Sequence, residues 1–466
     1  MDYIIKNAEI YDPEEGKYAY KDIGIKNGKI EKIDSNISLA KQIIDAKGLS
    51  LVPGFIDLHI HEDPIGIDSS NRFFTEECML KMGVTTVVGG NCGFSPSKIG
   101  DYFKYLGKHG SPTNTLLYSG YSVIRSMLGN KINDNVSSYR LGDVYKSLEI
   151  YEIDKLKPII RKHMDEGALG LSFGLEYTPG IDAEEIIRVV EVLSDYNNSL
   201  VASHYRYDAN RSLESIDESI FIAEKTRIPF QFSHIGSCSA FGYMEESLNK
   251  LNIARNKGID ISMDCYPYDA FSTLIGSAVF DEGCFERWGV DYNVVLPTEG
   301  KYKGQYCTKE MFNYLRKNEP NTRVVCFVMN ELEVNMAYKH PEVMVASDGK
   351  IKNGQGHPRG AGTFPRVLGK LVRKDKILSF EEAIKKMTLM PANRLGFKTK
   401  GRIKEGCDAD ITIINKDTII DNADYMEPSL PPFGLEYVFI NGKLALEKGE
   451  IVNLNAGKAI RRQDIS

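Results

Sequence analysis

Two histidines stand two positions apart, directly after an apolar run, in the stretch FIDLHIHEDP at residues 55–64. In an extended strand, residues i and i+2 point to the same face, so His59 and His61 can converge on one ion. Taken alone, the pair could equally be two incidental histidines at the edge of a core. The other strand ends must decide between these two interpretations.

Further ligand-type residues also follow short apolar runs of the chain. They are Cys92, His204, His234 and Asp348. Four imidazoles, one thiolate and one carboxylate suit zinc better than magnesium or calcium, which prefer oxygen ligands. A lone strand-end histidine is more often structural, and a lone cysteine is usually a small buried hydrophobe. Five strand ends that each supply a ligand make coincidence a poor explanation.

The runs that must position these residues recur through the middle of the chain. There are eight of them, at 51–60, 84–90, 115–123, 167–175, 199–205, 229–236, 258–268 and 343–349. Near-continuous apolar strands that alternate with helix-like segments indicate a parallel sheet covered on both faces. Eight such units predict an α/β fold of the (β/α)8 barrel (TIM barrel) type, in which sites lie at the C-terminal ends of the strands.

The two ends of the chain differ from this middle. Residues 1–50 and 398–466 contain alternating strands, with Asn-Gly turns at 27–28 and 441–442, and predict one small β-sandwich domain built from both termini. The barrel is then expected over 51–397. Residues 272–342 break its rhythm and are interpreted as a cap inserted before the last barrel strand. Ser379 and Glu382 form a capping-box pattern that predicts a closing helix.

Composition excludes several classes of protein. The net charge of −6 over 466 residues argues against a nucleic-acid partner. No run of 18 apolar residues and no signal-peptide pattern is found, so neither a membrane span nor export is expected. Eight scattered cysteines indicate reduced thiols, and the predicted location is cytoplasmic. The expected partner is a small-molecule substrate, and the oligomeric state is left open.

The motifs resemble a known family. PGFIDLHIH is similar to the first-strand signature of the amidohydrolase superfamily. Several longer motifs resemble the N-acyl-D-amino-acid deacylase (D-aminoacylase) family: GNCGFSP, GALGLSFGLEYTPG, DCYPYDA, SDG and HPRGAGTFPRVLG. The resemblance runs over nearly the whole chain. It implies a zinc-dependent enzyme that cleaves the amide bond of N-acyl-D-amino acids.

The resemblance also implies a role for each candidate. Cys92 would bind the metal and bridge two ions, and His204 and His234 would complete a tight zinc site. His59 and His61 would hold a second, weaker site. No lysine is available in GALGLSFGLEYTPG to bridge two ions, which favours Cys92 as the bridge, with Glu176 as the runner-up.

The remaining roles concern catalysis and substrate. Asp348 would be the acid/base, because a carboxylate can take the water proton and pass it to the leaving nitrogen. Arg359, together with Tyr266 or Tyr268, would hold the substrate carboxylate, and a guanidinium grips a carboxylate bidentately.

One departure from the family pattern leaves the substrate open. Family members commonly carry a lysine two residues after the sixth-strand histidine, where this chain has Gly236 followed by Ser237. A cyclic amidohydrolase that opens a hydantoin-like, dihydropyrimidine-like or other heterocyclic ring is therefore the alternative function. A catalytically inactive barrel would have lost ligands, and none of the six is lost.

Overall fold

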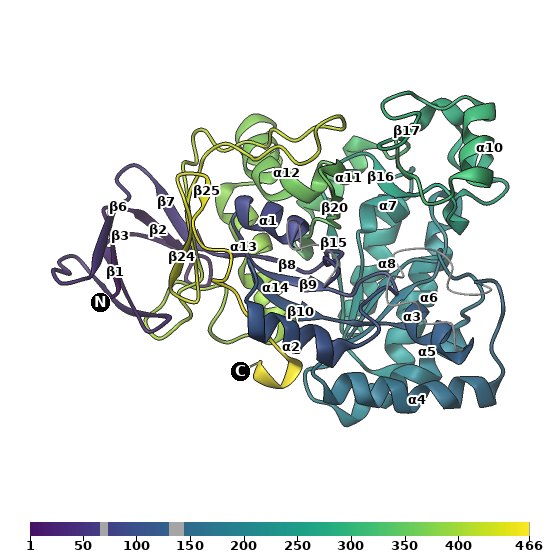
Figure 1. The fold of residues 1–466 in the computed structure, drawn as a ribbon, viewed down its shortest axis with the longest axis horizontal. Helices are drawn as coiled ribbons and strands as arrows, with labels where there is room; N and C mark the ends of the chain where they lie inside the picture. The colour runs from purple at the N-terminus through teal and green to yellow at the C-terminus, as the bar shows by residue number, and fades with distance from the viewer. Residues whose placement is uncertain (66–72, 130–143, 466) are drawn as a thin grey trace.

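The computed structural model describes residues 1–65, 73–129 and 144–465 (Figure 1). All eight predicted apolar runs form parallel strands, which confirms that part of the sequence interpretation. These strands are β8 (Phe55–Asp57), β9 (Val84–Gly89), β10 (Asn114–Leu117) with β11 (Ser119–Gly120), β12 (Gly170–Gly174), β13 (Leu200–His204), β14 (Phe230–Phe232), β15 (Ile261–Cys265) and β19 (Val343–Val345). Every residue in them is buried, as expected for a sheet covered on both faces.

The parallel strands follow one another in chain order. They form the arrays β8-β9-β10 and β11-β12-β13-β14-β15-β19, and a single residue, Tyr118, separates β10 from β11. Hydrogen bonds also join the first run to the last. The Asp348 amide donates to the His59 carbonyl at 2.8 Å, and Ile60 pairs with Gly349 in parallel register. The residues just beyond β8 and β19 are therefore held side by side.

Helices between the strands cover the parallel sheet. They are α1 (Phe74–Lys81), α2 (Ile99–His109), α3 (Tyr121–Ser126), α4 (Ile150–Asp165), α5 (Ala183–Val190), α6 (Ser212–Thr226), α7 (Ile235–Ser239), α8 (Met244–Asn256), α11 (Glu331–Lys339), α12 (Arg359–Arg366), α13 (Phe380–Met387) and α14 (Leu389–Leu395). The predicted capping box of Ser379 and Glu382 begins α13. In the described part of the chain, no helix has the length and apolar character needed to cross a membrane.

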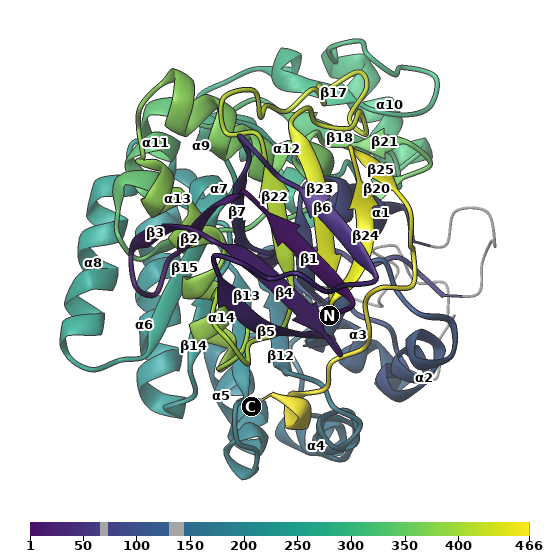
Figure 2. The ribbon, with the colours of Figure 1, turned by 90° about the vertical axis from the view of Figure 1, so that its left-hand side faces the viewer.

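Strands from both chain ends share one sheet. It lies at the left of Figure 1, and this end of the molecule faces the viewer in Figure 2. Its order is β25 (Glu450–Ile451), β24 (Lys443–Glu447), β23 (Leu435–Ile440), β22 (Ile411–Ile414), β7 (Ser50–Pro53), β2 (Glu9–Asp12) and β3 (Lys17–Tyr20). A second sheet contains β5 (Lys29–Asp34), β4 (Asp22–Lys26), β1 (Tyr3–Lys6) and β6 (Gln42–Asp45). Their buried isoleucines form a common core. Both Asn-Gly turns have positive φ at each residue, as a type I′ hairpin requires.

The predicted insertion contains a small antiparallel sheet of its own. Its strands are β16 (Phe271–Leu274), β18 (Arg323–Cys326) and β17 (Val295–Pro297), and its helices are α9 (Cys284–Trp288) and α10 (Lys309–Asn318). Phe280, Phe285, Trp288 and Phe312 stack edge to face and give this segment an aromatic core. In Figure 1 it lies at the upper right, next to α7. A two-stranded hairpin, β20 (Ile351–Lys352) and β21 (Gln355–Gly356), follows the last parallel strand.

Candidate metal centre

Three of the candidate ligands lie where the chain leaves a strand with unusual backbone geometry. Cys92, His234 and Asp348 have φ of 54°, 35° and 50°, in the left-handed region that non-glycine residues rarely adopt. Such strained residues persist where the surrounding structure holds them, and they concentrate at functional sites. The sharp turn after each strand lets these side chains face a common space.

One cluster of ligand-type atoms, here called the Cys92 triad, consists of Cys92, His204 and His234. The sulfur of Cys92 lies 4.0 Å from His204 Nδ1 and 3.7 Å from His234 Nε2, and the two nitrogens are 3.1 Å apart. All three side chains are buried. The structure therefore brings together the residues assigned to the tight site by the sequence.

A second cluster, here called the Asp348 group, contains His59, His61 and Asp348. Asp348 Oδ1 lies 3.1 Å from His61 Nε2 and 3.4 Å from His59 Nε2. His59 Nε2 is also 3.3 Å from the sulfur of Cys92. The thiol therefore stands between the two clusters, which is the place that a bridging ligand would occupy.

Burial sets the protonation of these groups. It lowers the pKa of His204 and His234 to about 3, so both imidazoles are neutral and keep a lone pair for a metal. Burial raises the pKa of the Cys92 thiol well above its ordinary value. Burial alone would also raise the pKa of Asp348. Electrostatic interactions with Arg359 and His59 outweigh this effect and hold the pKa of the carboxyl group well below its usual range.

The donor atoms fit a zinc ion. A buried thiol that resists ionisation becomes a thiolate only beside a strong positive charge, and a dication supplies that charge. Two neutral imidazoles and one thiolate form a soft set of the kind that zinc prefers. In the part of the chain that the structure describes, the groups of residues able to hold a metal are the Cys92 triad and the Asp348 group with Cys92.

Buried carboxylates and a hydroxyl hold the ligands from behind. Asp264 accepts the His234 backbone amide at 2.8 Å, and Asp57 accepts the His59 amide at 3.0 Å. Ser237 Oγ lies 2.7 Å from His234 Nδ1. The sequence analysis did not predict these contacts. For Asp57 and Asp264 the signal was a carboxylate inside an otherwise apolar strand, which is costly unless it has a structural partner.

Glu176, weighed as a metal bridge in the sequence analysis, contacts His204 from the other side. Its Oε2 lies 3.0 Å from His204 Nε2, whereas Nδ1 of the same ring faces the Cys92 triad. Burial raises the pKa of Glu176 to about 8, although nearby Arg287 opposes that shift. A carboxylate in this position fixes the ring orientation and the tautomer of a ligating histidine.

Of the candidate substrate-binding residues, Arg359 and Tyr266 line the pocket above the ligands, and Tyr268 is not in that lining. The Arg359 guanidinium lies over the Tyr266 ring and donates through Nη2 to Asp348 Oδ2 at 2.8 Å. Its Nε and Nη1 are buried without a partner among the described residues. The Tyr268 ring packs against Arg366 instead, because the chain has already left β15 at Cys265.

The pocket in this structure is small and partly closed by the insertion. Phe271, Ser272 and Val279 line it together with the metal-ligand candidates, and the cavity of about 10 Å³ has room for about one water.

The four remaining histidines lie outside both clusters. His163 contacts the Ser119 hydroxyl, His109 contacts a carbonyl in its own helix, and His340 contacts Asn252. His357 is buried, contacts the Ala270 carbonyl and accepts the Arg359 backbone amide. Each has a structural partner in the fold.

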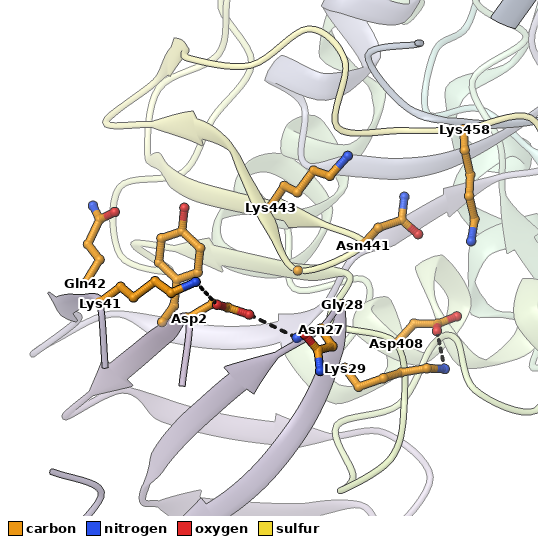
Figure 3. A pocket seen from close by; sticks show the side chains of 12 residues that line it. Asp2, Asn27, Gly28, Lys29, Lys41, Gln42, Asp408, Asn441, Lys443 and Lys458 are labelled. Atoms are coloured by element: carbon orange, nitrogen blue, oxygen red, sulfur yellow. Dashed lines mark hydrogen bonds and ion pairs between the residues drawn. The ribbon is translucent and has the colours of Figure 1, made fainter. Parts of the chain in front are cut away.

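A larger cavity, of about 710 Å³, lies in the β region formed by both chain ends (Figure 3). Its lining is polar and includes the ion pairs Lys41–Asp2 and Lys29–Asp408. It contains neither histidine nor cysteine, so it lacks the ligand chemistry of the Cys92 triad.

The chain is similar in sequence to known amidohydrolases. The Amidohydrolase family profile matches residues 42–130 and 335–445. The N-acyl-D-glutamate deacylase of Alcaligenes xylosoxydans xylosoxydans is 28% identical over 95% of this chain and 93% of its own length. The D-aminoacylase of the same organism is 27% identical over 99% and 98%. A dihydroorotase of Elusimicrobium minutum is 24% identical over 97% and 99%.

Solved structures of similar enzymes also superpose on this chain. A D-aminoacylase crystal structure superposes with a TM-score of 0.84 at 25% identity, and each chain is 99% covered. An N-acyl-D-glutamate deacylase from Bordetella bronchiseptica, complexed with zinc and a phosphonate inhibitor, superposes at 0.85 with the same identity and coverage. The resemblance stated from the motifs is thereby confirmed.

Proposed function

We propose that this chain, a metal-dependent hydrolase of amide bonds that resembles the D-aminoacylases, removes the acyl group from N-acyl-D-amino acids. The observation that carries the proposal is Arg359. Its guanidinium is buried beside Asp348 and has two N–H groups without a partner among the described residues, so it can receive a carboxylate next to the metal-ligand candidates.

The proposed ligands of a tightly bound zinc ion are the Cys92 triad. His59 and His61 would hold a second, weaker ion, with Cys92 as the bridge, since the thiol lies near a nitrogen of both clusters. When bound, zinc polarises an amide carbonyl and lowers the pKa of water to about 7. Glu176 is the poorer bridge, because it contacts the far nitrogen of His204.

Asp348 is the proposed acid/base. Its carboxylate is ionised and would accept a proton from the attacking water and then donate it to the leaving nitrogen. Its hydrogen bonds with Arg359 and His61 fix the orientation of the carboxylate. Phe271, at the start of β16, and Val279 would exclude bulk water from this step.

Arg359 would hold the substrate carboxylate, with the Tyr266 ring stacked against the guanidinium. Arg359 is the cationic residue among the described residues that line the pocket, and Phe271, Val279 and Tyr177 add uncharged surface. We therefore expect an amino acid with an uncharged side chain, because a second carboxylate would have no cation to receive it.

We also infer that the eight parallel strands close into a (β/α)8 barrel over residues 51–397. The bridge between Ile60 and Gly349 supports this closure. Residues 1–50 and 398–466 would form the small β domain, and 272–342 the cap.

The test uses zinc-loaded enzyme and matched substrates. N-acetyl-D-leucine should release free amine faster than its L enantiomer and faster than N-acetyl-D-leucinamide, which lacks the carboxylate. In Arg359→Met the preference for the carboxylate over the amide should fall about 10- to 100-fold, the worth of a charge-assisted hydrogen bond. Because Arg359 also contacts Asp348, both substrates will slow, and only their ratio reports carboxylate binding.

Two observations favour the cyclic-amide alternative enough to include it. The chain is similar to dihydroorotases over nearly its whole length. A Cβ atom at Gly236 would also lie 3.0 Å from Cys265 Sγ, so a lysine at this position would require its neighbours to shift by a few tenths of an ångström. Ring opening of dihydroorotate or hydantoins without turnover of any N-acyl-D-amino acid would replace the deacylase proposal with this one.

A further inference from the structure

The carboxyl group of Glu176 lies where its burial costs free energy. It is buried behind His204, whose Nε2 lies 3.0 Å from Glu176 Oε2. A buried carboxyl group needs fixed hydrogen-bond partners and, when ionised, a compensating cation. His204 supplies a hydrogen bond to Oε2, so a cation must come from another residue.

The compensating charge comes from the inserted segment. Arg287 of α9 places Nη2 3.6 Å from Glu176 Oε1, and its Nε donates to Asp208 Oδ1. The neighbouring Trp288 donates from Nε1 to the other Asp208 oxygen at 2.6 Å. Glu176 follows β12 and Asp208 follows β13, so a single guanidinium joins two strand-end loops to the insertion.

We propose that Arg287 is a positioning residue of the metal centre. It holds the Glu176 carboxylate against His204 Nε2, and this contact directs His204 Nδ1 toward Cys92 and His234. The insertion therefore completes the metal site in addition to covering it. The inference rests on the proposed zinc function of the Cys92 triad.

Loss of the guanidinium would leave the buried carboxyl groups of Glu176 and Asp208 without the side chain that joins them. Glu176 Oε1 would lose its cation, and the carboxyl group would be free to turn away from His204. His204 would then lose a fixed acceptor. Outer partners of metal-ligating histidines contribute about 10- to 100-fold to metal affinity.

The coupling must act in both directions. If docked Arg287 raises zinc affinity, bound zinc must stabilise the docking of Arg287 by the same factor, because linkage between two equilibria is reciprocal. Zinc should therefore slow the opening of the segment around α9, which lies outside the Cys92 triad in the sequence.

The experiment compares Arg287→Met, Arg287→Lys and the control Arg316→Met. Arg316 is another arginine of the insertion, but its hydrogen-bond partners, Ser277 and Asp281, belong to the insertion itself. Zinc affinity is measured by competition with a chromogenic chelator. We expect about 10- to 100-fold weaker binding in Arg287→Met, partial recovery in Arg287→Lys, and wild-type affinity in Arg316→Met.

A second measurement, amide hydrogen exchange, is made on the folded protein. Amide hydrogen exchange of residues 284–297 is followed with and without Zn²⁺, and zinc should protect this segment in wild type and in Arg316→Met but not in Arg287→Met. If Arg287→Met does not fold, Arg287→Lys and the wild-type exchange experiment give the answer.

The outcomes separate the two proposals. Tight zinc binding by wild type, with unchanged affinity in Arg287→Met and no zinc-dependent protection of 284–297, overturns the role of Arg287 and leaves the metal site intact. A wild-type protein that binds no zinc overturns both. Weakened binding in Arg287→Met alone, together with zinc-dependent protection, supports the inference.

Discussion

The two halves of the metal centre are held in different ways. In the Cys92 triad, each histidine has a fixed partner outside the cluster: Glu176 for His204, and Ser237 for His234. In the Asp348 group, both histidines contact Asp348, which Arg359 holds from outside, and Nδ1 of His59 has no partner among the described residues. The side chain of His61 is 27% exposed, whereas those of the triad are buried.

This contrast indicates how the two halves should behave. Ligands that are oriented before the ion arrives lose little freedom on binding, so the triad is prepared for one tight ion. The Asp348 group must exchange its internal hydrogen bonds for contacts with an ion. We therefore expect the second ion to bind more weakly, and Asp348 to serve chemistry rather than metal retention.

The largest effect should come from Cys92→Ala, because the thiol is close to both halves. We expect loss of tight zinc binding and a fall in activity of at least about 1000-fold, which corresponds to several kcal/mol of lost transition-state stabilisation. Metal analysis of the purified variant measures its zinc content, and a deacylation assay measures its activity. Cys78→Ala, at another buried free thiol, is the control. Unchanged zinc content in Cys92→Ala would refute the shared role of Cys92.

A smaller effect, confined to one half, should follow from Asp348→Asn. The amide keeps the shape of the side chain but cannot accept the proton, so kcat should fall by about 10²- to 10⁴-fold. Zinc affinity of the triad should stay within a few-fold of wild type, because Asp348 contacts the other half. Parallel measurements of kcat and chelator competition test this separation, and a large loss of the first zinc ion would merge the two halves into one unit.

The parts of this site that could be predicted from sequence are those encoded locally. Cys92, His204 and Asp348 each end or follow an apolar run, and parallel strands deliver their ends to one edge of the sheet. The choice between Tyr266 and Tyr268 could not be made, because strand alternation ceases where β15 ends at Cys265.

Arg287 could not be found in this way either. It lies in the inserted segment, and it becomes relevant only because that segment folds back onto Glu176 and Asp208, far from it in the chain. No local periodicity encodes such a contact. Charged residues that connect an insertion to a site therefore require the structure.

The smallest effect should come from His61→Asn, and it sharpens the contrast most directly. His61 contacts Asp348 and is partly exposed, so its loss should weaken the second ion and leave the first unchanged. A zinc titration of this variant should show one wild-type equivalent and a weakened or missing second one, with kcat within about 10-fold of wild type. His234→Asn is the matched comparison in the triad and should lose the tight equivalent, since His234 Nε2 faces both Cys92 and His204. Equal losses of zinc in the two variants would show that the halves bind metal as one cooperative unit. The difference in their hydrogen-bond partners outside each cluster would then have no functional consequence.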